Sequence, residues 1–164
     1  YKRMTVFDNV WVAQHSLPSI SLRDLILSNR KRENLRRQEV QHFLEVTGLM
    51  ECSDQLAGGL PLPQQRRLEL ARALIRSPDL LLLDEPAGGM TPAETEEMGA
   101  LIKKTAVPER TCIIIEHKMD LLSDLCQRLC VLNFGKKIAE GEPKEVFKHP
   151  DVIEAYLGRS RFNA

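Results

Sequence analysis

The stretch Leu80-Leu81-Leu82-Leu83-Asp84-Glu85-Pro86 decides the fold, because it joins four apolar residues directly to two adjacent carboxylates. A short, wholly apolar run is typical of a strand that is buried on both faces of a parallel sheet. Ligands of such sheets bind at the carboxyl ends of the strands, which is where the two acids stand. One acid can face a Mg²⁺ ion through its water shell while the other faces an attacking water. Taken alone, the pair also fits two solvated acids at the entry to a loop.

A second apolar run, Ile113-Ile114-Ile115, ends in Glu116-His117 and predicts another strand. Because the carboxyl ends of parallel strands meet at one edge of a sheet, His117 is expected near the two carboxylates. A histidine there can contact a phosphate, orient a water or titrate near neutral pH. By itself, His117 is more typical of an ordinary loop histidine.

A helix predicted at 64–76 is the third informative element, and the residues before it read Leu60-Pro61-Leu62-Pro63. Its apolar residues recur at the spacing of one helical face. The start of a helix has unpaired backbone N–H groups and the positive end of the helix dipole, so it can bind an anion. Pro61 and Pro63 fit equally well as residues that simply begin a helix.

The rest of the chain alternates strands with helices, which places it in the α/β class. Thr91-Pro92-Ala93-Glu94 predicts a helix start, with Thr91 as the N-cap and Glu94 closing a capping box. Gly48 predicts the end of an earlier helix. Further helices are expected at 5–14, at 118–126 and twice near the C-terminal end, and strands at 111–115, 128–132 and 137–139.

Length and composition are those of one globular domain, with 164 residues, 43% hydrophobic and 28% charged. Lys and Arg total 23, as do Asp and Glu, so no overall basic field favours nucleic acid as a partner. No apolar run approaches the roughly 18 residues that span a bilayer, and no signal peptide is recognisable. Four cysteines without a C-x-x-C pair favour ordinary thiols over a metal site or disulfide. These features predict a cytosolic domain.

In this order and spacing, the three elements resemble the second half of the ATP-binding subunit of an ABC transporter. Residues 60–64 stand where the family has its Leu-Ser-Gly-Gly-Gln signature, and residues 80–85 resemble the Walker B strand. Residues 88–91 resemble the D-loop, and His117 resembles the switch histidine. The resemblance implies a partial P-loop NTPase lobe of the RecA-like kind, with parallel strands and flanking helices, preceded by an α-helical subdomain.

The resemblance also suggests a subgroup and a division of the chain. The segments that look most like the branched-chain amino acid importer subgroup are 64–74, 116–120 and 152–158. The implied parts are a helical subdomain at 1–59, the signature, Walker B, D-loop and switch region at 60–140, and C-terminal helices at 141–164.

The cofactors that the resemblance implies are ATP and Mg²⁺, held between two subunits paired head to tail. By position, Asp84 would hold Mg²⁺, Glu85 would activate water and His117 would contact the γ-phosphate. The residues facing the partner's nucleotide would be Leu60, Pro61, Leu62, Pro63 and Gln64 of the signature, and Gly88, Gly89, Met90 and Thr91 of the D-loop. Catalysis of phosphoryl transfer is mostly positioning plus electrostatics.

The partners that the resemblance implies are a second ATP-binding subunit, identical or not, transmembrane permease subunits and, indirectly, a substrate-binding protein. The subdomain at 1–59 would dock on the permease at the cytoplasmic face of the cell membrane. The implied function is ATP hydrolysis coupled to uptake of branched-chain or related amino acids.

Two features depart from the family pattern. The 164 residues contain no G-x-x-x-x-G-K-[ST], the loop whose backbone and lysine cradle phosphates. The chain also begins at Tyr1 in mid-pattern, so it is expected to be a piece of something longer, with an incomplete, inactive site on its own. The sheet should then be open between the strands at 111–115 and 128–132. Pro63 occupies the signature's last glycine position, where it has no N–H to donate.

Two other functions stay open. The missing phosphate loop and Pro63 favour a non-catalytic module that pairs with an intact ATPase subunit. An ABC ATPase of a lipopolysaccharide-export system or of a non-transport system would carry the same motifs.

Overall fold

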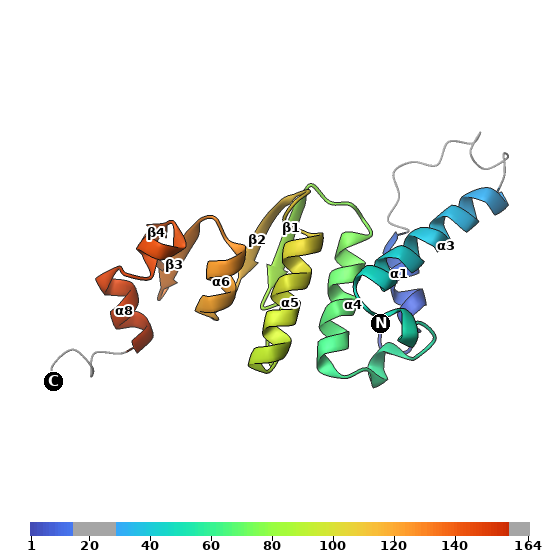
Figure 1. Ribbon diagram of the computed structural model, residues 1–164, viewed down its shortest axis with the longest axis horizontal. Helices are drawn as coiled ribbons and strands as arrows, with labels where there is room; N and C mark the ends of the chain where they lie inside the picture. The colour runs from blue at the N-terminus through green and yellow to red at the C-terminus, as the bar shows by residue number, and fades with distance from the viewer. Residues whose placement is uncertain (15–28, 158–164) are drawn as a thin grey trace. The chain divides into compact units, whose positions relative to one another are not determined.

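The computed structural model describes residues 1–14 and 29–157, in two compact units that comprise residues 1–115 and 116–164 (Figure 1). The first unit contains α1 (Val6–Gln14), α3 (Asn29–Val46), α4 (Leu62–Leu74), β1 (Leu80–Asp84), α5 (Pro92–Thr105) and β2 (Thr111–Ile115). The second contains α6 (Met119–Leu125), β3 (Leu129–Asn133), β4 (Lys136–Gly141), α7 (Pro143–Val146) and α8 (Pro150–Leu157). Helices and strands alternate from α4 to β3, which confirms the predicted α/β class.

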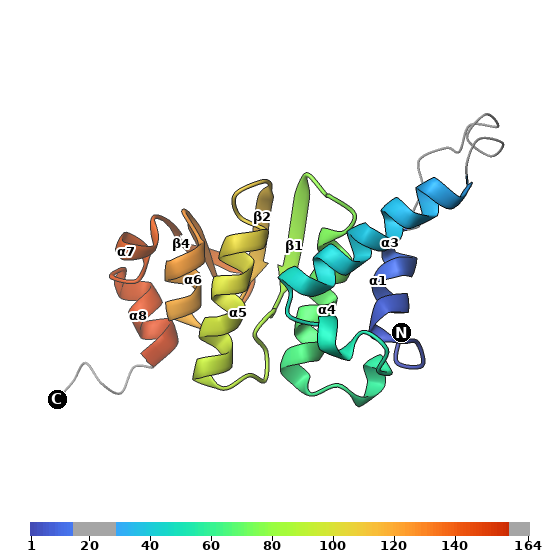
Figure 2. The same ribbon diagram turned by 45° about the vertical axis from the view of Figure 1, so that its right-hand side comes forward.

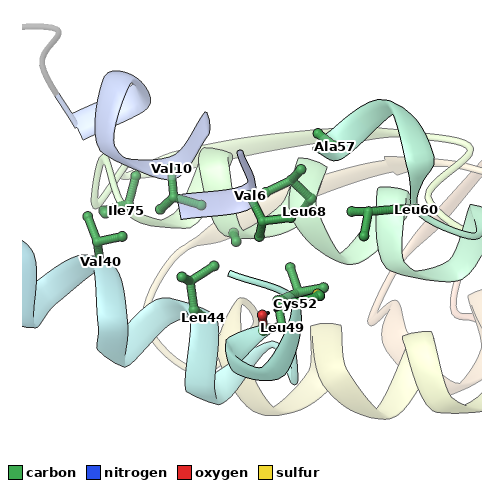
Figure 3. Packing of buried hydrophobic residues seen from close by; sticks show 11 residues of the cluster. Val6, Val10, Val40, Leu44, Leu49, Cys52, Ala57, Leu60, Leu68 and Ile75 are labelled. Carbon is green, nitrogen blue, oxygen red and sulfur yellow. Dashed lines mark hydrogen bonds between the residues drawn. The ribbon is translucent and has the colours of Figure 1, made fainter. Parts of the chain in front are cut away.

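A hydrophobic cluster packs α1, α3 and α4 together (Figure 3). Its members come from the three helices and from the loop that leads into α4: Val6, Val10, Val40, Leu44, Leu49, Cys52, Ala57, Leu60, Leu68, Ala71 and Ile75. Full burial of one large aliphatic side chain contributes about 1.5–3 kcal/mol. Leu60 belongs to this cluster, so the residue that opens the predicted signature is anchored in the helical core. Among the described helices, none is both long enough and apolar enough to cross a membrane.

Two helix boundaries confirm their sequence signals. Gly48 follows α3 with a φ of +70°, and the N–H of Leu49 donates to the Leu44 carbonyl at 2.7 Å. At the start of α5, the N–H of Glu94 donates to Thr91 Oγ1 at 3.4 Å, and Glu94 Oε2 accepts from the Thr91 N–H at 2.8 Å. This reciprocal pair is the predicted capping box.

Strands β1 and β2 form a parallel pair, in register from Leu80 opposite Thr111 to Asp84 opposite Ile115. The prediction that β1 is buried on both faces is wrong. Leu81 is 4% exposed, but Leu82, which points to the opposite face, is 66% exposed. Helix α5 runs alongside this pair (Figures 1 and 2). In the described chain only one face of the pair is packed, so only alternate residues are buried.

The open side of this pair is an apolar face formed by Leu80, Leu82, Ile113 and Ile115, which are 50%, 66%, 52% and 62% exposed. Exposed apolar sheet surface of this kind promotes association between chains. We expect the 164-residue chain to self-associate in sedimentation velocity, and the double variant Leu82→Lys/Ile113→Lys to shift it toward monomer. Leu35→Lys, at an equally exposed leucine of α3, should change nothing. A wild-type chain that sediments as a monomer and melts in one cooperative transition would contradict this prediction.

The second unit is built on a hairpin of β3 and β4, which pair antiparallel. Its turn passes through Phe134 and Gly135, whose φ values are +47° and +75°, as a tight two-residue hairpin requires. Helix α7 packs on both strands and α8 packs on β4. In the described chain β1 and β2 form one two-stranded sheet and β3 and β4 form another. The expected opening of the sheet between the strands at 111–115 and 128–132 stays a prediction. The functional division at 1–59, 60–140 and 141–164 stays a prediction.

Candidate functional site

Asp84 and Glu85 stand at the carboxyl end of β1, as the sequence predicts. Asp84 is the last residue of the strand and lies on the same face as Leu80 and Leu82. The backbone N–H of Glu85 donates to the Ile115 carbonyl at 2.9 Å, so the chain leaves β1 beside the end of β2. Both acidic residues are exposed. Both residues are therefore accessible to a ligand.

The turn after β1 holds Glu85 in the left-handed region, with a φ of +44°. This conformation is uncommon for a residue with a side chain, and such strain clusters at functional sites. The Gly88 N–H closes the turn by donating to the Glu85 carbonyl at 2.9 Å. A Cβ at Gly88 would lie 3.1 Å from that carbonyl and 3.4 Å from Glu85 Oε2. Gly88 thus leaves room for the Glu85 side chain to lie close over the turn.

The predicted signature forms the first turn of α4. Pro61 is the N-cap, so Leu62, Pro63 and Gln64 are the first three helical residues. The first amide to find a helical acceptor is that of Gln65, which donates to the Pro61 carbonyl at 3.0 Å. The amides ahead of it have no acceptor within the helix, and Pro63 carries none. This helix start therefore offers an anion two amide donors, from Leu62 and Gln64, instead of three.

The predicted D-loop packs against this helix start at Gly89. Gly89 has a φ of +77°, and a Cβ placed on it would lie 2.9 Å from Leu62 Cδ2. Ala87 and Met90 on either side are buried, at 0% and 8% exposed. The structure therefore brings the predicted signature and D-loop together, a contact that no local pattern in the sequence reveals.

Gly89→Ala is expected to destabilise the chain by about 1–2 kcal/mol, because a left-handed φ is unfavourable for a residue with a Cβ. The added methyl group would also push on Leu62. Urea unfolding followed by circular dichroism measures the change. Gly59→Ala is the matched control, since a Cβ there meets nothing within 4 Å. Equal stability of the two variants would show that the D-loop backbone is not constrained at Gly89.

An ion pair that the sequence analysis missed links α4 to α5. Arg67 Nη2 lies 2.7 Å from Glu97 Oε2, and Arg67 Nη1 donates to the Thr47 carbonyl at 3.5 Å. Arg67 thus connects the end of α3, the first turns of α4 and the exposed side of α5. Partners that lie 30 residues apart leave no periodic signal in a sequence.

His117 belongs to the second unit, whereas Asp84 and Glu85 belong to the first. Glu116 Oε2 accepts hydrogen bonds from the N–H groups of His117 at 2.8 Å and Lys118 at 3.3 Å. The Tyr156 hydroxyl, from α8, donates to the His117 carbonyl at 2.8 Å. Burial, and then the negative charge of Glu116, raise the pKa of Tyr156. The sequence analysis gave no role to Tyr156 or Glu116.

The exposed Asp84 carboxylate fits a hard cation. Mg²⁺ prefers oxygen ligands and takes one or two carboxylates together with water and phosphate oxygens. The amides of Leu62 and Gln64, at the positive end of the α4 dipole, fit a phosphate. The donor sets of the first unit are thus compatible with a magnesium–nucleotide complex.

Comparison with known proteins agrees with this chemistry. Residues 2–88 match the family described as ABC transporter. The chain belongs to the ABC transporter family. Residues 136–161 also match the segment described as branched-chain amino acid ATP-binding cassette transporter. The identification made from the signature, Walker B, D-loop and switch segments is therefore confirmed.

Named relatives of this ABC chain are transport ATP-binding proteins. It is 39% identical over 164 residues to the high-affinity branched-chain amino acid transport ATP-binding protein BraF of Pseudomonas aeruginosa. It is 38% identical over 164 residues to the corresponding protein LivG of Escherichia coli. Both alignments include 98% of this chain, which spans 64% of the length of these curated relatives.

Solved ABC structures share the fold. A nucleotide-free ATP-binding cassette from an ABC transporter superposes with a TM-score of 0.77 at 28% identity, over 96% of this chain and 64% of that one. CbiO1 of Clostridium perfringens, part of the ABC transporter complex cbiONQ, gives a TM-score of 0.72 at 26% identity, over 96% and 59% of the two chains. The predicted fold class is confirmed by this likeness.

Proposed function

We propose that this chain is part of an ATP-binding and ATP-hydrolysing subunit that energises uptake of branched-chain amino acids. The observation that carries the proposal is strand β1, which ends in two exposed carboxylates beside β2 and is followed by a strained turn at Glu85. The names of BraF and LivG, and the match of residues 136–161, support the substrate class.

In the proposed reaction, bound Mg-ATP supplies the γ-phosphoryl group that is transferred to water. Asp84 would hold Mg²⁺. Glu85 accepts a proton from the attacking water as general base. His117 contacts the γ-phosphate from the switch segment. Because phosphoryl transfer needs mainly positioning and charge stabilisation, these three side chains supply what this chain contributes on its own side of the site.

The signature and D-loop serve a second nucleotide site, that of a partner ATP-binding subunit. The α4 amides of Leu62 and Gln64 face the partner's ATP, and the contact of Gly89 with Leu62 keeps the D-loop beside them. We propose further that the helical part at 1–59 docks on transmembrane permease subunits at the inner face of the membrane, with a substrate-binding protein as an indirect partner.

Pro63 favours a second candidate, a degenerate module that pairs with an intact ATPase subunit but does not stimulate it. The proline removes one donor from the signature helix, because it lacks an N–H group. Such a module would still form a nucleotide-dependent dimer, but the dimer would hydrolyse ATP no faster than the partner alone.

Calorimetry and transport test the proposal on the protein expressed in full from its gene. Titration with Mg-ATP should give micromolar binding, and Asp84→Asn should weaken its dependence on Mg²⁺. The gene should restore labelled leucine uptake to a strain that lacks its own branched-chain ATP-binding subunit. No binding at millimolar ATP would refute the ATPase function, whereas hydrolysis without restored leucine uptake would refute the substrate class alone.

A further inference from the structure

We infer that Tyr156 and Glu116 are positioning residues for His117, whose backbone they hold between helix α8 and the start of α6. The inference rests on the proposed function, in which His117 contacts the γ-phosphate. It extends that function to two side chains, one of them in the C-terminal helix, that touch neither nucleotide nor metal.

The Glu116 carboxylate is the first group that positions the His117 backbone. Its side chain is 0% exposed, and Oε2 binds the N–H groups of His117 and Lys118 at 2.8 and 3.3 Å. The same oxygen lies 3.3 Å from His117 Nδ1. A buried carboxylate is costly unless it is satisfied by hydrogen bonds. Among the described residues the buried Oε1 has no hydrogen-bond partner, so the two amides at Oε2 are the hydrogen bonds that hold the side chain in this turn. The Glu116 carboxylate therefore lies beside the Nδ1 edge of the imidazole.

The Tyr156 hydroxyl is the second group that positions the His117 backbone. It donates to the His117 carbonyl at 2.8 Å, on the opposite side of the residue from the amide that Glu116 binds. Helix α8 is anchored one turn earlier by Val152, which is 0% exposed and lies on the same helical face. Both backbone polar groups of His117 are therefore bonded to side chains, while its imidazole is 64% exposed.

The position of Tyr156 in the chain links this contact to a segment that matches branched-chain amino acid cassettes. Tyr156 lies within residues 136–161, the segment that matches branched-chain amino acid cassettes. That segment contains β4, α7 and α8, and it reaches the switch residue through the bond from the Tyr156 hydroxyl to the His117 carbonyl. Helix α8 thus sets the position of His117 as well as closing the second unit.

Tyr156→Phe tests the inference, because it removes the hydroxyl and keeps the ring. In the protein expressed in full, we expect kcat for ATP hydrolysis to fall about 10-fold to 100-fold, as for a misplaced catalytic group, with KM for ATP and the melting temperature unchanged. Tyr1→Phe is the matched control and should behave as wild type. Glu116→Gln, which keeps the shape of the side chain but changes its hydrogen bonding, should lower kcat in the same way.

A spectroscopic readout reports on His117 without any nucleotide. In ¹⁵N-histidine-labelled protein, His117 should show one dominant tautomer with the proton on Nδ1. Tyr156→Phe and Glu116→Gln should reduce that preference or broaden its signals by exchange, while His42 and His149 stay unchanged as internal references. Unchanged His117 signals in both variants would overturn the inference.

The kinetic outcomes separate this inference from the function on which it rests. If Glu85→Gln stops hydrolysis but Tyr156→Phe keeps the wild-type kcat, the positioning role is wrong and the proposed function stands. If Tyr156→Phe only lowers the melting temperature, with kcat per folded molecule unchanged, the hydroxyl is structural and the inference is overturned. If the wild-type protein hydrolyses no ATP, the proposed function fails and the positioning role fails with it.

Discussion

Glu85→Gln should lower the rate of ATP hydrolysis by about 10²-fold to 10⁴-fold, the usual contribution of a general base, while ATP binding is kept or strengthened. Glutamine has the shape of glutamate but cannot accept the proton of the attacking water at neutral pH. The turn that presents the side chain is made by backbone groups, the Glu85 N–H and carbonyl, which the substitution leaves in place. Phosphate release measures the rate, and calorimetry measures the binding.

A second observable follows from the same substitution. A subunit that binds ATP but cannot hydrolyse it should accumulate as a nucleotide-bound dimer, visible by gel filtration in the presence of Mg-ATP. Glu96→Gln, at an exposed residue of α5, is the control for loss of one negative charge. Wild-type hydrolysis by Glu85→Gln would assign the base to another residue, and equal loss in both variants would mean that net charge, not proton transfer, matters.

The sequence predicts best those elements whose sequence patterns lie within a few neighbouring residues. The apolar run before Asp84, the capping box at Thr91 and the glycine at the end of α3 each act within a few residues, and each is confirmed. The burial of β1 is the instructive failure. Four consecutive leucines indicate a strand that can be buried on both faces, but which faces are covered depends on what packs there, and Leu82 is exposed.

In the candidate site, too, the sequence predicts some features and misses others. The two acids could be placed at the end of a strand because residues 80–85 specify both the strand and its chemistry. Gly89 contacts Leu62, which is 27 positions away, and Tyr156 bonds to His117, which is 39 positions away. Such separations are not part of the helix or strand repeat, so no periodic pattern in the sequence reveals these contacts. Contacts of this kind come from tertiary packing, so they required the structure.

Pro63→Gly is expected to raise the hydrolysis rate at the partner's nucleotide by up to about 10²-fold, the scale on which one preorganised backbone donor contributes to a transition state. Pro63 is the second residue of α4, where an N–H would have no acceptor within the helix and would point at the ligand. Glycine restores that donor. It also removes the pyrrolidine ring from a place where a phosphate must approach the backbone closely.

Pro63→Ala separates these two effects, because alanine restores the N–H but keeps a side chain. If the missing donor limits the rate, both variants should be faster than wild type by similar factors. If bulk limits the rate, only glycine should be faster. Pro92→Ala, at the first residue of α5, restores an amide at a different helix start and should leave hydrolysis unchanged. No gain in either Pro63 variant would mean that the Leu62 and Gln64 amides already suffice, and that the proline is no obstacle to catalysis by the pair.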